Sequence, residues 1–312
     1  MTDGRAPAPS VFAPAGVEAD ALAELAAELR GGGALLFAAT MLLLALALRR
    51  PRRRVRGGWW VLGGGVALPV AVLTALLAYA TLRTRGLERP PAAAPLIVGL
   101  TAHQWWWEVR YTDAATGRSV TGANELRLPA GRPARIGLES ADVIHSVWVP
   151  ALGGKMDLVP GRVNHLTMTP HAPGVHRGQC AEYCGGPHAH MALHVVVLPP
   201  DEFARWLERE ARPAPAPAGA LEARGRTAFV EHGCTACHAR RGVADGGGRG
   251  PDLTHVAGRL HLAAGALPND AASLAHWIAD VQAVKPGARM PSYGHLDAAT
   301  LGALAAFLAQ PR

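Results

Sequence analysis

Two short stretches hold all four cysteines of the chain, and both are rich in residues that bind metals. The first is QCAEYCGGPHAHM, residues 179–191, in which Cys180, Cys184 and His188 recur at every fourth position. Thiolate and thioether ligands favour copper, whereas two cysteines and two histidines without a methionine would suit tetrahedral zinc. The donor set predicts copper, because the zinc alternative leaves Met191 without a role.

A complete copper site needs a further ligand from elsewhere in the chain. His145, in DVIHSVWVP, stands at the start of a predicted strand far upstream. Two bridging thiolates predict a pair of copper ions, with one histidine on each. His190 and His194 are alternatives to His188. However, His190 breaks the four-residue spacing, and His194 is expected to point away from the site.

The second stretch is CTACH, residues 234–238. In an external domain, Cys-x-x-Cys-His attaches c-type haem: Cys234 and Cys237 bind it covalently, and His238 takes one axial position of the iron. A thioredoxin-like pair or half of a zinc site is the alternative, but neither needs a histidine directly after the second cysteine. The motif therefore predicts covalent haem.

A second axial ligand for the iron is predicted downstream. Met290 lies in KPGARMPSYG, a proline-flanked loop that cannot be a regular helix, so its thioether can be held toward the iron. As an alternative, Met290 simply fills the core. The other histidines of this region, ranked below Met290, are His255, His261, His276 and His295.

Two apolar segments, residues 31–48 and 59–82, precede these motifs, and each is long enough for a helix to cross a bilayer. The loop between them holds a run of arginines: Arg49, Arg50, Arg52, Arg53, Arg54 and Arg56. Because arginines stay on the cytoplasmic side, we predict a hairpin anchor whose later domains face outward. Much of the formal net charge of +7 thus comes from this loop, so the charge does not indicate a nucleic-acid-binding face. The acidic N-terminal tail does not resemble a cleaved signal peptide.

Residues 91–207 are predicted to form an all-β domain. Short runs of apolar residues alternate with polar ones, and Gly and Pro separate the runs, as in a β-sandwich or small barrel. The predicted strands are residues 96–100, 105–111, 125–128, 135–139, 144–149, 163–169 and 192–198. His145 then lies near the start of one strand, and Met191 leads into another.

A different pattern follows residue 207. Residues 208–220 are rich in proline and alanine and predict an extended linker. In residues 221–312, Leu221, Gly225 and Phe229 share one helical face. A second apolar stripe consists of Leu301, Leu304 and Leu308. We therefore predict a separate all-α domain around CTACH.

The motifs of this last region resemble a known family. RGRTAFVEHGCTACH, GPDLTHVAGR and RMPSY are similar to a class I cytochrome c domain, over about residues 221–310. In that family the first and last helices cross at a small residue, which would be Gly225 here.

The whole chain shows a wider resemblance. The copper motif, HQWWWEVRY, DVIHSVWVPALGGKMDLVPGR and the two-helix anchor resemble subunit II of the cytochrome c oxidases, in the version with a fused cytochrome c. The match runs over about residues 10–207 and continues through the haem motif. It implies a multidomain membrane protein: residues 1–90 form a tail and a transmembrane hairpin, and residues 91–207 a cupredoxin-like domain.

The oxidase resemblance also implies roles for particular residues. The ligands of its dinuclear CuA centre would be His145, Cys180, Glu182, Cys184, His188 and Met191. Glu182 would bind copper through its backbone carbonyl, and its carboxylate would reach a magnesium site at the boundary with subunit I. Trp105 matches the tryptophan through which electrons reach copper, although Trp106 stands where many members have tyrosine. Alternatively, these tryptophans are ordinary strand core.

The chemistry of such centres limits the function. A six-coordinate haem and a fully ligated copper pair offer no open position, so this chain is expected to transfer single electrons and not to activate dioxygen. The resemblance implies that electrons pass from an external donor, such as a cytochrome c, through haem c to CuA. They would then reach subunit I, where dioxygen becomes water and protons are pumped.

The expected location is the bacterial plasma membrane (the inner membrane), with the copper and haem domains on the periplasmic face. The expected partners are subunit I and other oxidase subunits. A CuA-bearing component of a nitrogen-oxide reductase, and a membrane-anchored copper-delivery protein, remain alternatives. The intact cysteines exclude a quinol oxidase subunit.

Overall fold

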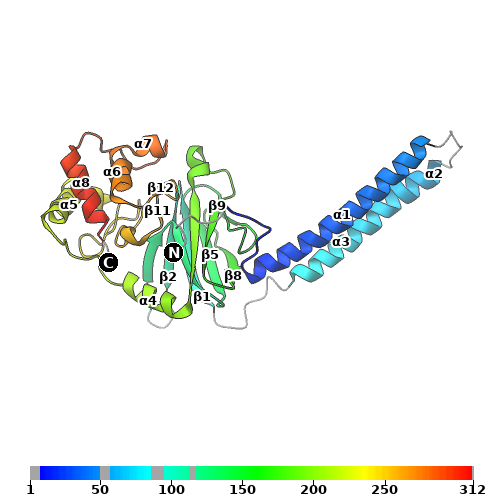
Figure 1. The fold of residues 1–312 in the computed structure, drawn as a ribbon, viewed down its shortest axis with the longest axis horizontal. Helices are drawn as coiled ribbons and strands as arrows, with labels where there is room; N and C mark the ends of the chain where they lie inside the picture. Colours follow the sequence, from blue (N-terminus) through cyan, green and yellow to red (C-terminus); the bar gives the residue numbers. More distant parts are fainter. Residues whose placement is uncertain (1–7, 50–56, 86–94, 113–116, 118, 311–312) are drawn as a thin grey trace.

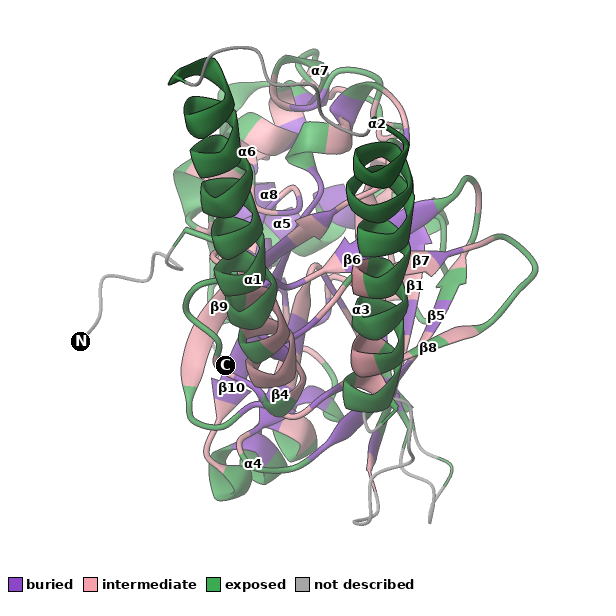
Figure 2. Cartoon of the chain, turned by 90° about the vertical axis from the view of Figure 1, so that its right-hand side faces the viewer, coloured by how far each residue is buried: buried purple, intermediate pink, exposed green. Residues whose placement is uncertain are grey.

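Two long helices project from the folded body of the chain (Figure 1). The structure, a computed structural model, describes residues 8–49, 57–85, 95–112, 117 and 119–310. The first long helix is α1 (Val17–Arg49), and the second joins α2 (Gly57–Trp59), the π-helical η1 (Trp60–Ala67) and α3 (Leu68–Thr84). Both are long and apolar enough to cross a membrane, and their apolar stretches are exposed (Figure 2).

The two predicted apolar helices are confirmed, but the first begins earlier than expected. Residues 17–30, expected as part of a tail, form the first turns of α1. The carboxylate of Glu18 accepts hydrogen bonds from the backbone N and the hydroxyl of Thr169, at 2.8 and 2.9 Å. Acidic residues suit the first turn of a helix, so the polarity of this segment marks a helix start. The arginine-rich loop, residues 50–56, lies outside the described residues.

Residues 95–210, here called the β domain, contain two five-stranded sheets. The first, in the order β3-β2-β1-β5-β8, consists of Ser119–Ala123, Trp106–Thr112, Leu96–His103, Ala134–Ser140 and Asn164–Met168. The second, in the order β4-β10-β9-β6-β7, consists of Glu125–Pro129, Ala192–Leu198, Gly174–Cys180, His145–Trp148 and Met156–Leu158. All seven predicted strands are present. Three further strands, β3, β7 and β9, were not predicted.

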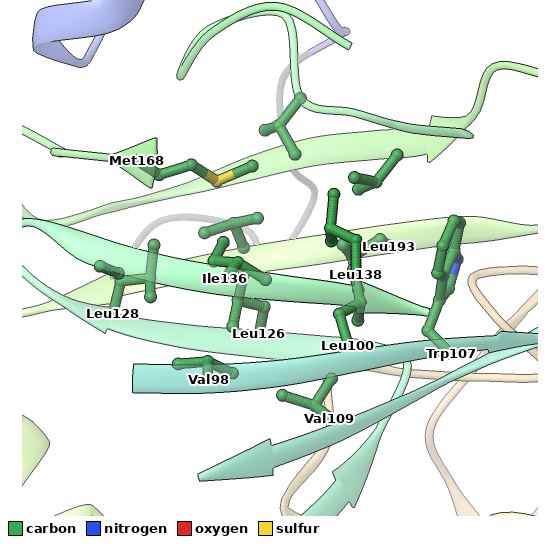
Figure 3. Packing of buried hydrophobic residues seen from close by; sticks show 14 of the residues in the cluster. Val98, Leu100, Trp107, Val109, Leu126, Leu128, Ile136, Leu138, Met168 and Leu193 are labelled. Atoms are coloured by element: carbon green, nitrogen blue, oxygen red, sulfur yellow. The ribbon is translucent and has the colours of Figure 1, made fainter. Parts of the chain in front are cut away.

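The core of the β domain lies between the two sheets. Along β1, Val98 and Leu100 are buried while Ile97 is exposed, which is the two-residue alternation of a strand with one face inward. Figure 3 shows side chains of both sheets in this cluster, including Leu100, Ile136, Leu138, Leu126 and Leu193. Each such side chain contributes roughly 1.5–3 kcal/mol on burial. The packed sandwich therefore holds the loops at its ends in fixed positions.

One further helix completes the β domain. This is α4 (Pro200–Glu210), whose Phe203 and Trp206 pack on Tyr111 with ring centroids 6.2 and 5.2 Å apart. The chain then leaves the sandwich.

Residues 220–310, here called the helical domain, contain α5 (Ala220–Glu231), α6 (Ala271–Ala279), α7 (Val281–Val284) and α8 (Ala298–Leu308). Two short strands, β11 (His261–Leu262) and β12 (Leu267–Pro268), form a hairpin. Helices α5 and α8 cross at Gly225, where a Cβ atom would lie 2.0 Å from the carbonyl oxygen of Ala303. Only glycine permits this approach, so the expected crossing is present.

The segment between Glu210 and Ala220 is attached to the helical domain. The backbone N of Ala214 donates to the carbonyl of Arg241 at 3.0 Å, and the Gln310 amide donates to the carbonyl of Ala216 at 3.2 Å. This segment contains no helix or strand, and these hydrogen bonds hold it against the helical domain, whereas residues 208–210 of the predicted linker belong to α4.

Candidate copper and haem sites

The predicted metal ligands lie at one end of the second sheet. His145 is the first residue of β6, Cys180 is the last of β9, and Met191 directly precedes β10. Strands β6 and β10 both pair with β9, and the register sets Val147 opposite Cys180. Sheet topology therefore brings together residues that are far apart in the sequence.

The two thiols and two of the histidines form a chain of close contacts. Cys180 Sγ lies 3.7 Å from Cys184 Sγ and 3.8 Å from Nδ1 of His145. His188, carried by the 3-10 helix η2 (Gly186–His190), places its Nδ1 3.5 Å from Cys184 Sγ. Two thiolates that each lie ~2.3 Å from one ion at a tetrahedral angle are ~3.8 Å apart. These separations are those of ligands that share metal ions.

The remaining predicted donors lie on either side of the thiols. Met191 Sδ is 3.9 Å from Cys184 Sγ, and the carbonyl oxygen of Glu182 is 3.2 Å from Cys180 Sγ. His145, both cysteines and Met191 are buried. The site is thus a dry pocket of soft donors, and the thioether has a place in it that a zinc site would not use.

The charge of the thiol pair also suits a cation. The hydrogen bond from Cys184 lowers the pKa of Cys180 to about 3, and the same bond raises the pKa of Cys184. The Cys180 thiol therefore loses its proton more readily than the Cys184 thiol. Because metal ligands must be thiolates, a cation is needed to hold both in that form.

The buried ring of His145 is oriented by Asp142. The His145 Nε2 lies 2.9 Å from the Asp142 carboxylate, which also accepts hydrogen bonds from the backbone N of Gln104 and of Val143. Burial raises the pKa of Asp142, but these hydrogen bonds outweigh it and the pKa is lowered. With Nε2 held by a carboxylate, Nδ1 is free to bind a metal, as in many histidine sites.

The alternative histidines lie elsewhere. His190 is exposed, and His194 stacks on His261 of the helical domain with ring centroids 4.3 Å apart. Neither shares the sulfur contacts of His188.

A cavity of about 670 Å³ contains all four predicted haem residues in its lining: Cys234, Cys237, His238 and Met290. Such a volume is typical of a cofactor site. Its other walls are largely apolar and include Phe229, Leu253, Val256, Leu274, Ile278 and Leu304.

His238 is oriented inside this cavity. Its Nδ1 lies 2.7 Å from the carbonyl oxygen of Pro251, so that Nδ1–H donates and Nε2 is the ring nitrogen available to bind a metal. Burial lowers the pKa of His238, which favours the neutral ring that binds a metal. A Cβ at Gly250 would lie 2.6 Å from the ring, so glycine is needed beside it.

Of the four competing histidines, only His261 lines the cavity, and its ring is stacked on His194. His255, His276 and His295 are not part of the lining. The residues present therefore fit a covalent haem with His238 and Met290 on either side.

The β domain supplies part of the cavity wall, which the sequence did not reveal. His103, Gln104, Trp105 and Trp106 all line it. The indole N–H of Trp105 and the amide of Gln104 each donate to the carbonyl oxygen of Cys184 at 2.9 Å. Trp105 thus lies between the cavity and a predicted copper ligand. The HQWWW motif pointed to Trp105 as a functional residue, but it did not indicate that His103, Gln104 and Trp106 line the same cavity.

Comparison with known proteins identifies two domains in the chain. Residues 114–198 match the family model of the cytochrome c oxidase subunit II periplasmic domain, and residues 222–311 match that of cytochrome c. The chain is 37% identical over 211 residues to cytochrome c oxidase subunit 2 of Alkalihalophilus pseudofirmus, and 31% identical over 229 residues to that of Bacillus sp. strain PS3. Each match covers 68% of this chain, and 60% and 61% of the relatives.

One solved structure is also similar over part of the chain. The periplasmic domain of subunit II of cytochrome oxidase from Bradyrhizobium japonicum is 31% identical, with 38% of this chain and 94% of that domain covered and a TM-score of 0.35. The sequence matches identify both domains. The chain belongs to the cytochrome c oxidase subunit II family and carries a cytochrome c domain at its C-terminal end.

Proposed function

We propose that this chain receives electrons for a respiratory haem-copper cytochrome c oxidase. Electrons pass from an external donor, such as a cytochrome c, through haem c to a dinuclear CuA centre and on to subunit I, where dioxygen is reduced to water with proton pumping. The observation that carries the proposal is Trp105, which lines the haem cavity and donates a hydrogen bond to the carbonyl of Cys184.

In the copper site, Cys180, Cys184, His145 and His188 would hold the copper, in line with their mutual contacts. Met191 and the carbonyl of Glu182 complete the set, in line with their contacts to the two sulfurs. Copper and haem iron supply one-electron chemistry. The protein holds the ligands in place, with Asp142 orienting His145, and keeps water out.

In the haem site, Cys234 and Cys237 would hold the haem covalently, and His238 and Met290 would bind its iron. The Pro251 carbonyl fixes the His238 ring. A haem held by these residues would supply one-electron transfer, and the chemistry of dioxygen would be left to subunit I.

The location follows from the hairpin. We propose that α1 and the 57–84 helix span the bacterial plasma membrane and pack against subunit I and other oxidase subunits, because their apolar side chains are exposed in this chain. The β and helical domains then lie on the periplasmic side. This orientation rests on the arginine-rich loop.

The proposed role of Glu182 in magnesium binding concerns its carboxylate alone. Its carboxylate lies 3.6 Å from Lys155 Nζ, which is also 3.7 Å from Asp157. Magnesium takes about six oxygen ligands, so the carboxylates of Glu182 and Asp157 do not complete a site by themselves. We propose that Glu182 supplies one ligand in the assembled complex with subunit I.

Purification of the full-length chain from its native membrane should yield a complex with a large polytopic subunit. Metal and haem analysis should give two coppers in the CuA site and one covalent haem c for each copy of this chain. The complex should consume dioxygen with a reduced cytochrome c. A copper-delivery protein would instead purify alone, and a nitrogen-oxide reductase component would support reduction of a nitrogen oxide.

A further inference from the structure

The helical domain is packed on the β domain by specific hydrogen bonds at two places. At the first, the turn over residues 258–264 meets strands β4 and β10. The contacts are Leu260 N to Glu125 Oε2 at 2.8 Å, Arg127 Nη2 to the Gly258 carbonyl at 2.8 Å, and Ala192 N to the Ala264 carbonyl at 2.9 Å. Three hydrogen bonds therefore fix the orientation of the helical domain at this place.

Lys285 is at the centre of the second place. It follows α7 and is 4% exposed. Its Nζ donates to the carbonyl of Trp105 in the β domain at 2.7 Å and to the carbonyl of Ala263 in its own domain at 3.1 Å. One ammonium group therefore joins the two domains directly at the tryptophan that lies against Cys184.

Burying the amine of Lys285 costs free energy, and a requirement to fill space does not explain why a lysine stands here. Among the described residues, no carboxylate lies within 4.0 Å of its Nζ to compensate the charge. Burial accordingly lowers the pKa of Lys285 to about 7. A methionine would fill similar space without this penalty, so the amine is better explained by its bonds across the domain boundary.

The same loop carries Met290. Arg289, next to Met290, places its guanidinium 3.3 Å from the amide oxygen of Gln104 and 3.9 Å from the Asp142 carboxylate. Lys285 and Arg289 thus hold the two ends of the loop against residues 104–105 and 142. The position of the haem ligand relative to Trp105 depends on these contacts.

We propose that Lys285 is a positioning residue that locks the helical domain onto the β domain, with the haem cavity closed against Trp105. This docking does not depend on what the two domains bind. Its consequence, fast electron transfer from haem to copper, rests on the function proposed above.

The test is hydrogen exchange of the full-length chain in its purified complex, comparing Lys285→Met with Arg226→Met, a control on the exposed face of α5. The amides of Leu260 and Ala192 donate across the boundary and exchange when the domains separate. Losing both hydrogen bonds of the Lys285 amine should speed their exchange by about tenfold or more. Amides within α5 should exchange as before, and Arg226→Met should match the parent protein.

Unchanged exchange of Leu260 and Ala192 in Lys285→Met would overturn the proposal. The reduced haem spectrum shows whether the variant keeps its fold. If Lys285→Met loses haem, Lys285→Gln, which keeps a polar head but is too short to reach both carbonyls, should give the same faster exchange.

Electron transfer from haem to copper, followed after flash reduction in the same samples, separates the docking from the function. It should slow by about tenfold or more in Lys285→Met, in parallel with the loss of protection. If protection is lost while the transfer rate is unchanged, Lys285 still locks the domains, but the proposed electron route through this contact is wrong.

Discussion

Replacing Cys184 with serine should abolish the dinuclear copper centre and leave the haem attached. Cys184 Sγ contacts Cys180 Sγ at 3.7 Å, His188 Nδ1 at 3.5 Å and Met191 Sδ at 3.9 Å, so it joins donors on both sides of the site. A hydroxyl stays protonated and is a hard donor, so it cannot bridge two copper ions. We expect the mixed-valence copper signal to disappear in electron paramagnetic resonance.

The haem provides the matched control for this change. Cys234→Ser lies in the other cavity, so it should weaken covalent haem attachment and leave two coppers bound. Metal analysis and the reduced haem spectrum of the two variants should therefore change in opposite ways. Zinc at full occupancy in the native protein, or an intact copper signal in Cys184→Ser, would contradict the copper assignment.

Replacing Met290 with alanine should open one axial position of the haem iron and lower its reduction potential. The thioether favours reduced iron, and Met290 lies in the wall of the cavity that also contains His238. Since axial ligands control haem potentials over a range of ~0.8 V, a fall on the order of 0.1 V or more is expected. Redox titration of the haem band in the full-length protein measures it directly.

Met156→Ala, a change of the same size in β7 and outside the cavity lining, is the control and should leave the potential unchanged. An identical reduced spectrum and potential in Met290→Ala would mean that this methionine only fills space. The external donor should also reduce the Met290→Ala haem more slowly, because the driving force for that step falls.

The sequence predicts most of the sandwich but not its full pairing. Strand β5, with the sequence ARIGLES, alternates between buried apolar residues and more exposed ones, and it lies close to its predicted position. Strand β9, with the sequence GVHRGQC, contains two glycines and two basic residues and shows no such alternation. It is held as a strand by pairing with β10 and β6 on either side, a tertiary effect that local pattern does not encode.

The proposed copper ligands could be found from the sequence because most of them lie close together along the chain. Five of the six proposed copper donors lie within residues 180–191, so their spacing alone brings them near one another. The support around them was partly visible: Asp142 stands three residues before His145 and could have been proposed as its partner. The contact of Lys285 with Trp105 could not be proposed from the sequence, because the two residues are 180 positions apart and only the packing of two domains brings them together.

The direct test of the proposed electron route is rapid mixing of the oxidised complex with its reduced donor in the absence of dioxygen. The haem and copper absorption bands are followed separately at increasing donor concentrations. Reduction of the haem should come first, at a rate proportional to donor concentration, and the copper should follow in a step that does not depend on the donor. Reduction of the copper before the haem, or at a full rate in a Cys234→Ser, Cys237→Ser double variant that has lost its haem, would show that electrons do not pass through the helical domain.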